Sequence, residues 1–174
     1  MQYSFATNYD ARALNAMAKC LRKTVRQKHS KRSHRLGWLV VILALLPTLL
    51  GGQLDGRKVI MLVVGLIMVL ALVFEDRLNG FVARSRMLKG TESATALFDT
   101  ENPDCFTSET AVGKSDFFYH SIVALAETDR YFVFIFSKNH AQAYDKTSLT
   151  GGTAQQFRIF IEERTGKSVV PVTK

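Results

Sequence analysis

Cysteine and proline are scarce in this chain of 174 residues, which has two cysteines and three prolines. Cys20 and Cys105 lie far apart, and neither belongs to a Cys-x-x-Cys pair or to a zinc-ligand spacing. We therefore expect no disulfide framework, no zinc site and no other metal or cofactor. Both thiols should stay free in a reducing compartment.

Charge is absent from two long stretches, 36–54 and 59–74, which are apolar on every face of a helix. A helix rises about 1.5 Å per residue, so about 20 residues cross the roughly 30 Å hydrocarbon core of a bilayer. The second stretch is shorter, but Lys58 and Arg77 can extend their charges to the interface. A chain this small could not bury two such helices in a soluble core. We predict transmembrane helices at 36–54 and 59–76, joined by an extracytoplasmic turn at 55–58.

The net charge of +8 is distributed unevenly along the chain. Residues 1–35 sum to +8, residues 36–90 to +3 and residues 91–174 to −3. The segment expected to be globular is therefore mildly acidic and has no basic stripe, which argues against nucleic-acid binding.

Basic residues crowd the entrance to the first apolar stretch, whereas the turn contains only Arg57 and Lys58. The positive-inside rule then places both termini in the cytoplasm of a multi-pass inner-membrane protein. Basic side chains near an anionic leaflet contribute about 1 kcal/mol each. The residues expected to anchor the chain in this way are Lys28, Lys31, Arg32 and Arg35.

The N-terminal segment 1–35 shows two patterns. Alternating Tyr3 and Phe5 predict a strand over residues 2–7 that adds to a sheet formed by the C-terminal region. Apolar residues at helical spacing predict a basic amphipathic helix from Asn8 to Val25, with a capping box of Thr7 and Asp10 at its start. His29 and His34 are expected to be solvated.

Residues 77–90 are expected to be a helical extension or linker, and strand signals dominate from residue 91. A helix is predicted from Thr153 to Arg164, with Phe157, Phe160 and Ile161 facing the sheet. We expect an antiparallel meander closed by this helix. The predicted strands are 95–98, 105–112, 117–125, 131–136 and 141–144, with turns at 102–104, 113–114 and 128–129.

No motif in the sequence carries recognisable chemistry. The two Gly-Lys-Ser triplets, at 113–115 and 166–168, lack the upstream glycine of a phosphate-binding loop. Gly151-Gly152 is favoured as a simple loop over an anion site. His120 and His140 are expected to lie apart, so no acid–base pair is predicted.

Several segments resemble the YcxB-like family of bacterial membrane proteins, in which two transmembrane helices precede a small pleckstrin-homology-like domain. The resemblance covers nearly the whole chain. It rests on Tyr3 to Asp10, on Tyr119-His120-Ser121-Ile122 with Glu127-Thr128, on Ala143 to Lys146 with Leu149, and on Phe157-Arg158. It implies an α+β membrane protein with a pleckstrin-homology-like antiparallel β-domain over 91–174. The motif residues that it suggests for interaction are Tyr119, Ile122, Lys146 and Arg158.

Family members generally have no assigned enzymatic activity, so the resemblance implies no catalytic residue. Our leading hypothesis is a non-enzymatic bacterial inner-membrane protein that presents its domain at the cytoplasmic face to a protein or lipid. The alternative is a self-immunity protein against a membrane-active toxin or bacteriocin. The sequence leaves open whether the chain forms a homo-oligomer, and it does not identify the ligand.

Overall fold

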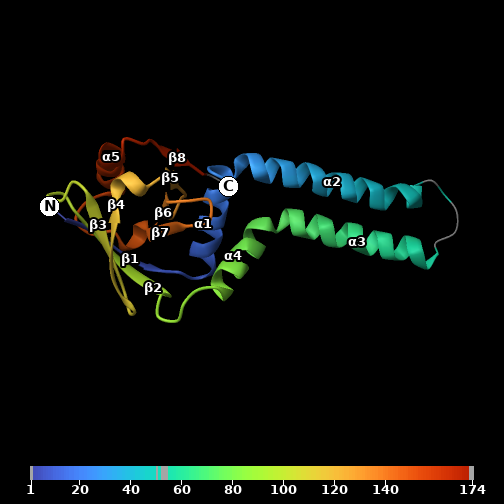
Figure 1. The fold of residues 1–174 in the computed structure, drawn as a ribbon, viewed down its shortest axis with the longest axis horizontal. Helices are drawn as coiled ribbons and strands as arrows, with labels where there is room; N and C mark the ends of the chain where they lie inside the picture. Colours follow the sequence, from blue (N-terminus) through green and yellow to red (C-terminus); the bar gives the residue numbers. More distant parts are fainter. Residues whose placement is uncertain (1, 50, 52–54, 173–174) are drawn as a thin grey trace.

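The computed structural model describes residues 2–49, 51 and 55–172. One end contains two β-sheets, and the other contains two long antiparallel helices, α2 (Gln27–Leu49) and α3 (Gly56–Val73) (Figure 1). We call α2 and α3 the helix pair. The protein is thus α+β, but a membrane hairpin is an expectation that the structure does not itself show.

The helix pair differs from the two predicted spans. Among the described residues, α3, with 18 residues, is the one helix long and apolar enough to cross a membrane. In α2 the apolar part follows a basic first half, and the predicted span runs on into residues 50 and 52–54, which lie outside the described residues. The predicted turn at 55–58 is also corrected. Asp55 is the N-cap of α3, where its carboxylate accepts a 2.9 Å hydrogen bond from the Lys58 amide.

Small residues hold the helix pair together. An added Cβ on Gly37 would lie 2.8 Å from the Leu72 side chain, and one on Gly65 would lie 3.3 Å from the Ala44 Cβ. Glycine and alanine allow helices to approach closely, as they do in membrane helix pairs.

Helix α3 ends at Phe74, and α4 (Glu75–Ser85) begins at once at a new angle. Helix α4 packs along α1 (Ala11–Lys23), where Gly80 lies directly against Asn15. Asp10 caps α1 by accepting a 2.8 Å bond from the Ala13 amide. The predicted capping box is wrong, because Thr7 is a buried strand residue whose hydroxyl accepts the Asp145 amide instead.

Sheet A is an antiparallel meander in the order β1-β2-β3-β4. The predicted addition of the N-terminal strand is confirmed, because residues 2–8 pair in register with residues 99–93. The strands are β1 (Gln2–Asn8), β2 (Ser93–Asp99), β3 (Cys105–Thr110) and β4 (Gly113–Phe118). The predicted turn at 113–114 is therefore the start of β4.

Sheet B has the order β7-β6-β5-β8, and it is mixed because β8 runs parallel to β5. The strands are β5 (Ala124–Glu127), β6 (Tyr131–Ile135), β7 (Ala141–Asp145) and β8 (Val169–Pro171). The helix that we predicted to close the domain is therefore followed by one more short strand, β8. The predicted strand 117–125 is broken by a 3-10 turn at Tyr119–Ser121, which lets the Tyr119 ring enter the core.

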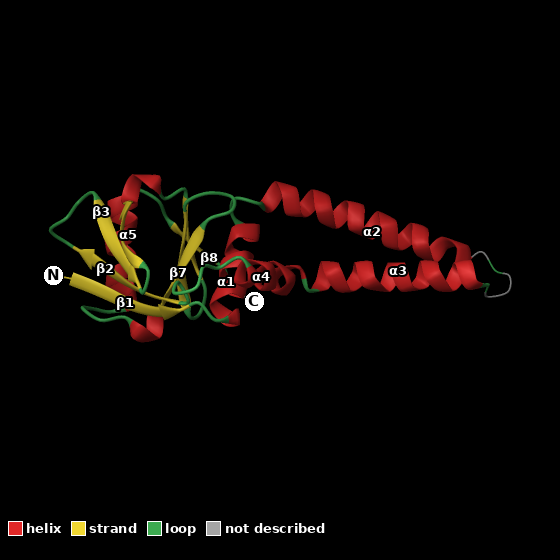
Figure 2. Ribbon diagram, turned by 60° about the horizontal axis from the view of Figure 1, so that its bottom comes forward, coloured by secondary structure: helices red, strands yellow, loops and turns green. Residues whose placement is uncertain are grey.

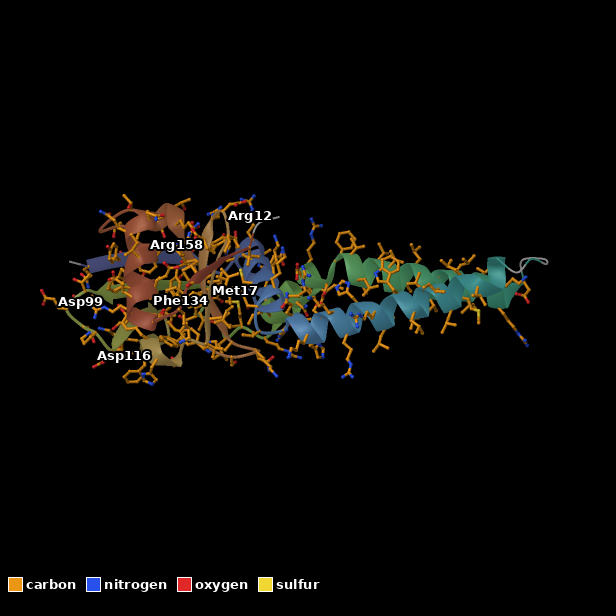
Figure 3. The ribbon with its side chains drawn as sticks, turned by 90° about the horizontal axis from the view of Figure 1, so that it is seen from above. Arg12, Met17, Asp99, Asp116, Phe134 and Arg158 are labelled. Carbon is orange, nitrogen blue, oxygen red and sulfur yellow. The ribbon has the colours of Figure 1, made fainter. Side chains whose placement is uncertain are left out.

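Helix α5 (Ala154–Thr165) packs on the sheets as predicted, with Phe157 and Ile161 fully buried and Phe160 9% exposed. We call the two sheets with α5 the two-sheet domain (Figure 2). Its core is aromatic, and Phe134 lies deep within it (Figure 3). Strand β6 is buried on both faces because α1 covers the outer face of sheet B. A strand covered on both faces can be apolar throughout, which explains the run YFVFI.

Candidate functional site

Two of the four family-motif residues meet at one carboxylate. The Lys146 ammonium lies 2.5 Å from Glu127 Oε1 and donates to the Thr128 carbonyl at 2.6 Å. Arg158, on α5, approaches Glu127 Oε2 at 3.5 Å and Glu162 at 3.6 Å (Figure 3). Every charge in this cluster has a charged partner, and the cluster links β5 to the 3-10 turn Lys146–Ser148 and to α5. Its geometry fits a structural clamp better than an open ligand site.

The other two motif residues are buried in the core of the two-sheet domain. Tyr119 is 2% exposed and Ile122 is 1% exposed, so neither can form an interaction surface. Burial raises the pKa of Tyr119 well above its usual value. Its hydroxyl has no hydrogen-bond partner within the described part of the chain.

The basic residues expected to anchor the chain are exposed on α2, near the end that joins the two-sheet domain. Lys28, Lys31, Arg32 and Arg35 lie where a bilayer surface would be if the helix pair crossed a membrane. His34, predicted to be solvated, instead lies 2.7 Å from Glu75, which begins α4.

A second ion cluster joins the helices, and sequence reasoning missed it. Arg22 of α1 binds both carboxylate oxygens of Asp76 at 2.7 Å. The hydrogen bonds to Asp76 outweigh desolvation and raise the pKa of Arg22. These residues are 54 positions apart, so no local spacing could have indicated the pair.

His120 and His140 contact different aromatic rings and do not form an acid–base pair. His120 stacks on Phe118 at 5.3 Å, whereas His140 stacks on Phe136 at 5.0 Å. Within the part of the chain that the structure describes, no group of three or more histidine, cysteine or acidic side chains could hold a metal ion. Burial raises the pKa of Cys20 to about 12, so this thiol stays protonated at neutral pH.

The Gly151-Gly152 loop has a packing role. Gly151 has φ +86°, and an added Cβ would lie 1.9 Å from the Gln2 carbonyl oxygen, next to the bridge between Ser4 and Thr150. Glycine is thus needed for β1 to approach the loop. Gly166, in the second Gly-Lys-Ser triplet, caps α5 with φ 64°.

A cleft of about 810 Å³ lies where the two-sheet domain meets the helices. We call it the junction cleft. Sheet A, the start of β7, α1 and the end of α4 enclose it, with Leu14, Met17 and Met87 among the apolar lining. Its ionisable lining residues, as far as the chain is described, are Tyr9, Arg26, Arg86 and His140. Partial burial lowers the pKa of His140, so this imidazole is neutral near pH 7.

The fold and these sites define an α+β protein with two packed sheets, joined through the packed helices α1 and α4 to an apolar helix pair. No family model, no curated protein and no solved structure matches the chain.

Proposed function

We propose that the chain is a non-enzymatic membrane-anchored module, whose helix pair crosses the bilayer and holds the two-sheet domain at the cytoplasmic face. The observation that carries the proposal is the outer surface of the helix pair. Along α3 and the apolar part of α2 from Leu36 to Leu46, it exposes large apolar side chains, and these exceed what a soluble surface tolerates. Ten of them are between 50% and 66% exposed: Leu36, Trp38, Leu39, Ile42, Leu43, Ile60, Val63, Leu66, Ile67 and Val73.

The charge pattern supports an apolar bilayer as the covering. Ionisable residues are absent from 36–54 and from 59–74, and they resume at both ends of the helix pair. The 16 residues of the second range span about 24 Å as a helix, close to the hydrocarbon thickness once flanking side chains reach the interface. Basic residues gather at the end next to the two-sheet domain, which favours a cytoplasmic position for that domain.

The connection between the two parts supports rigid presentation. Arg22, Asp76 and Glu75 join α1 to the start of α4, and α1 is itself part of the core on sheet B. A domain fixed in this way presents the same surface to the membrane at all times, as a protein- or lipid-binding module requires.

A pleckstrin-homology-like fold for the two-sheet domain is the finer part of this proposal. Two sheets packed around an aromatic core, with a C-terminal helix across them, support it. Strand β1 comes from the N-terminal stretch on which the resemblance partly rests, whereas the parallel strand β8 is an addition that the resemblance did not imply.

Extraction of the expressed full chain tests the anchor. We expect the protein to stay in the membrane pellet after alkaline carbonate and to be released by detergent. Alkaline phosphatase fused after Lys174 should be inactive, and a fluorescent protein at the same position should be active. A soluble oligomer, in which further copies cover the helix pair, would contradict the proposal.

A further inference from the structure

We propose that the junction cleft binds a single-chain anionic amphiphile, with the acyl chain inside the cleft and the acidic head at Arg86. This inference deepens the proposed function and rests on it, because the bilayer is the source of such a ligand. The ligand recognised at the cytoplasmic face is then a lipid, bound in the junction cleft.

The shape and lining of the cleft fit an acyl chain. Its volume of about 810 Å³ lies within the range of small-molecule sites. Leu14, Met17 and Leu21 of α1 form one side, and Ala94 and Ser108 of sheet A form another. Unbranched methionine adapts to flexible apolar ligands. Figure 3 shows Met17 at the side of the two-sheet domain that faces the helix pair.

The charges at the cleft fit an acidic head. Within the described lining, Arg26 and Arg86 are the charged side chains at neutral pH, and acidic ones are absent. Arg26 donates to the Lys138 carbonyl and to Asn139, so it holds the hairpin between β6 and β7. Arg86 is exposed beyond the end of α4 and is placed to contact a carboxylate or phosphate.

The path into the cleft leads from the expected bilayer surface. Helix α4 lies between α3 and the two-sheet domain (Figure 1). Phe81 and Leu88 are each 72% exposed, and Leu88 also lines the cleft. Apolar side chains exposed beside basic ones are typical of segments at a membrane interface. Leu88 therefore gives the cleft an exposed apolar edge, where an acyl chain would enter.

Photolabelling of the full chain in phosphatidylcholine nanodiscs tests this inference. The probe is a palmitic acid analogue with a mid-chain diazirine, and labelled peptides are mapped by mass spectrometry. We expect labelling of α1 near Met17 and of the segment around Met87. Unlabelled palmitate should compete, whereas its uncharged methyl ester should compete less.

Arg86→Glu and Arg84→Glu form the matched pair. Both reverse an exposed charge on the same segment, but Arg84 does not line the cleft. We expect Arg86→Glu to lower cleft labelling about fivefold, or about 1 kcal/mol, and Arg84→Glu to leave it nearly unchanged. Ser115→Trp, which fills the cleft from the exposed strand β4, should also abolish labelling.

Labelling confined to the helix pair, equal effects of the two arginine variants, or full labelling of Ser115→Trp would each overturn the inference. Carbonate extraction of the same preparations tests separately whether the helix pair anchors the chain in the membrane. A carbonate-soluble chain with unequal arginine effects would overturn the anchor alone, and a membrane-bound chain with equal effects would overturn the cleft alone.

Discussion

The two-sheet domain and the helix pair are stabilised in different ways. In the domain, bulky rings interlock: Phe5 lies 4.7 Å from Phe157, and Phe98 stacks on Phe106 at 4.5 Å. In the helix pair, the buried contacts are small and the large side chains point outward. The two-sheet domain excludes water from its interior, whereas the helix pair needs an apolar environment around its outer surface. The same apolar residue is therefore a core residue in one region and a contact to the environment in the other.

Phe157→Asp should have the largest effect in the two-sheet domain. It would place a charge among Tyr3, Phe5 and Phe98, where the ring is fully buried. We expect a loss of at least about 4 kcal/mol in the free energy of unfolding, enough to unfold the domain. Ile159→Asp on the same helix is the control, because Ile159 is 48% exposed. Chemical denaturation of the full chain in detergent would measure both. Equal losses would show that α5 is not docked as described.

Gly65→Leu should have the next largest effect, and this effect should be confined to the helix pair. A side chain there would meet Ala44, and overpacking of this kind costs about 1–3 kcal/mol. Gly56→Leu is the control, since nothing lies within 4 Å of an added Cβ at Gly56. We expect faster amide hydrogen exchange in α3 for Gly65→Leu alone. Unchanged exchange would show that the helices are not in close contact.

Arg22→Met tests the connection between the two regions. Both side chains of its ion pair with Asp76 are about a quarter exposed, so solvent screening limits the loss to about 1 kcal/mol. Amide exchange in α4 should increase while the core of the two-sheet domain stays protected. Arg84→Met, on the exposed side of α4, should leave both unchanged. Destabilisation of the whole domain would instead make Arg22 part of its core.

The smallest expected effect is that of pH at His140. Partial burial lowers its pKa in the folded state, so the unfolded chain binds its proton at higher pH. Stability should therefore fall slightly as pH drops through about 6.5 towards the lower folded pKa. Thermal melting should show that His140→Gln removes this slope and that His120→Gln, at an exposed residue, does not.

The sequence alone determined the features that depend on local pattern. Alternating aromatic residues within 2–7 indicated strand β1. The docked face of α5 was indicated by the i, i+3, i+4 spacing of Phe157, Phe160 and Ile161. Two uncharged runs indicated the helix pair. These patterns persist because burial of one face is the main reason that each element forms.

Only the tertiary structure decided the positions of residues whose surroundings come from distant parts of the chain. The local pattern predicts Thr7 in a helix capping box, but its hydroxyl accepts a hydrogen bond from the Asp145 amide, 138 positions away. The resemblance suggests Tyr119 and Ile122 as interaction residues, but a 3-10 turn places both in the core. Lys146 and Arg158 share Glu127, and residues from α1, α4 and both sheets enclose the junction cleft. Sequence patterns report which side chains avoid water, whereas the neighbour that each side chain meets depends on how distant elements pack.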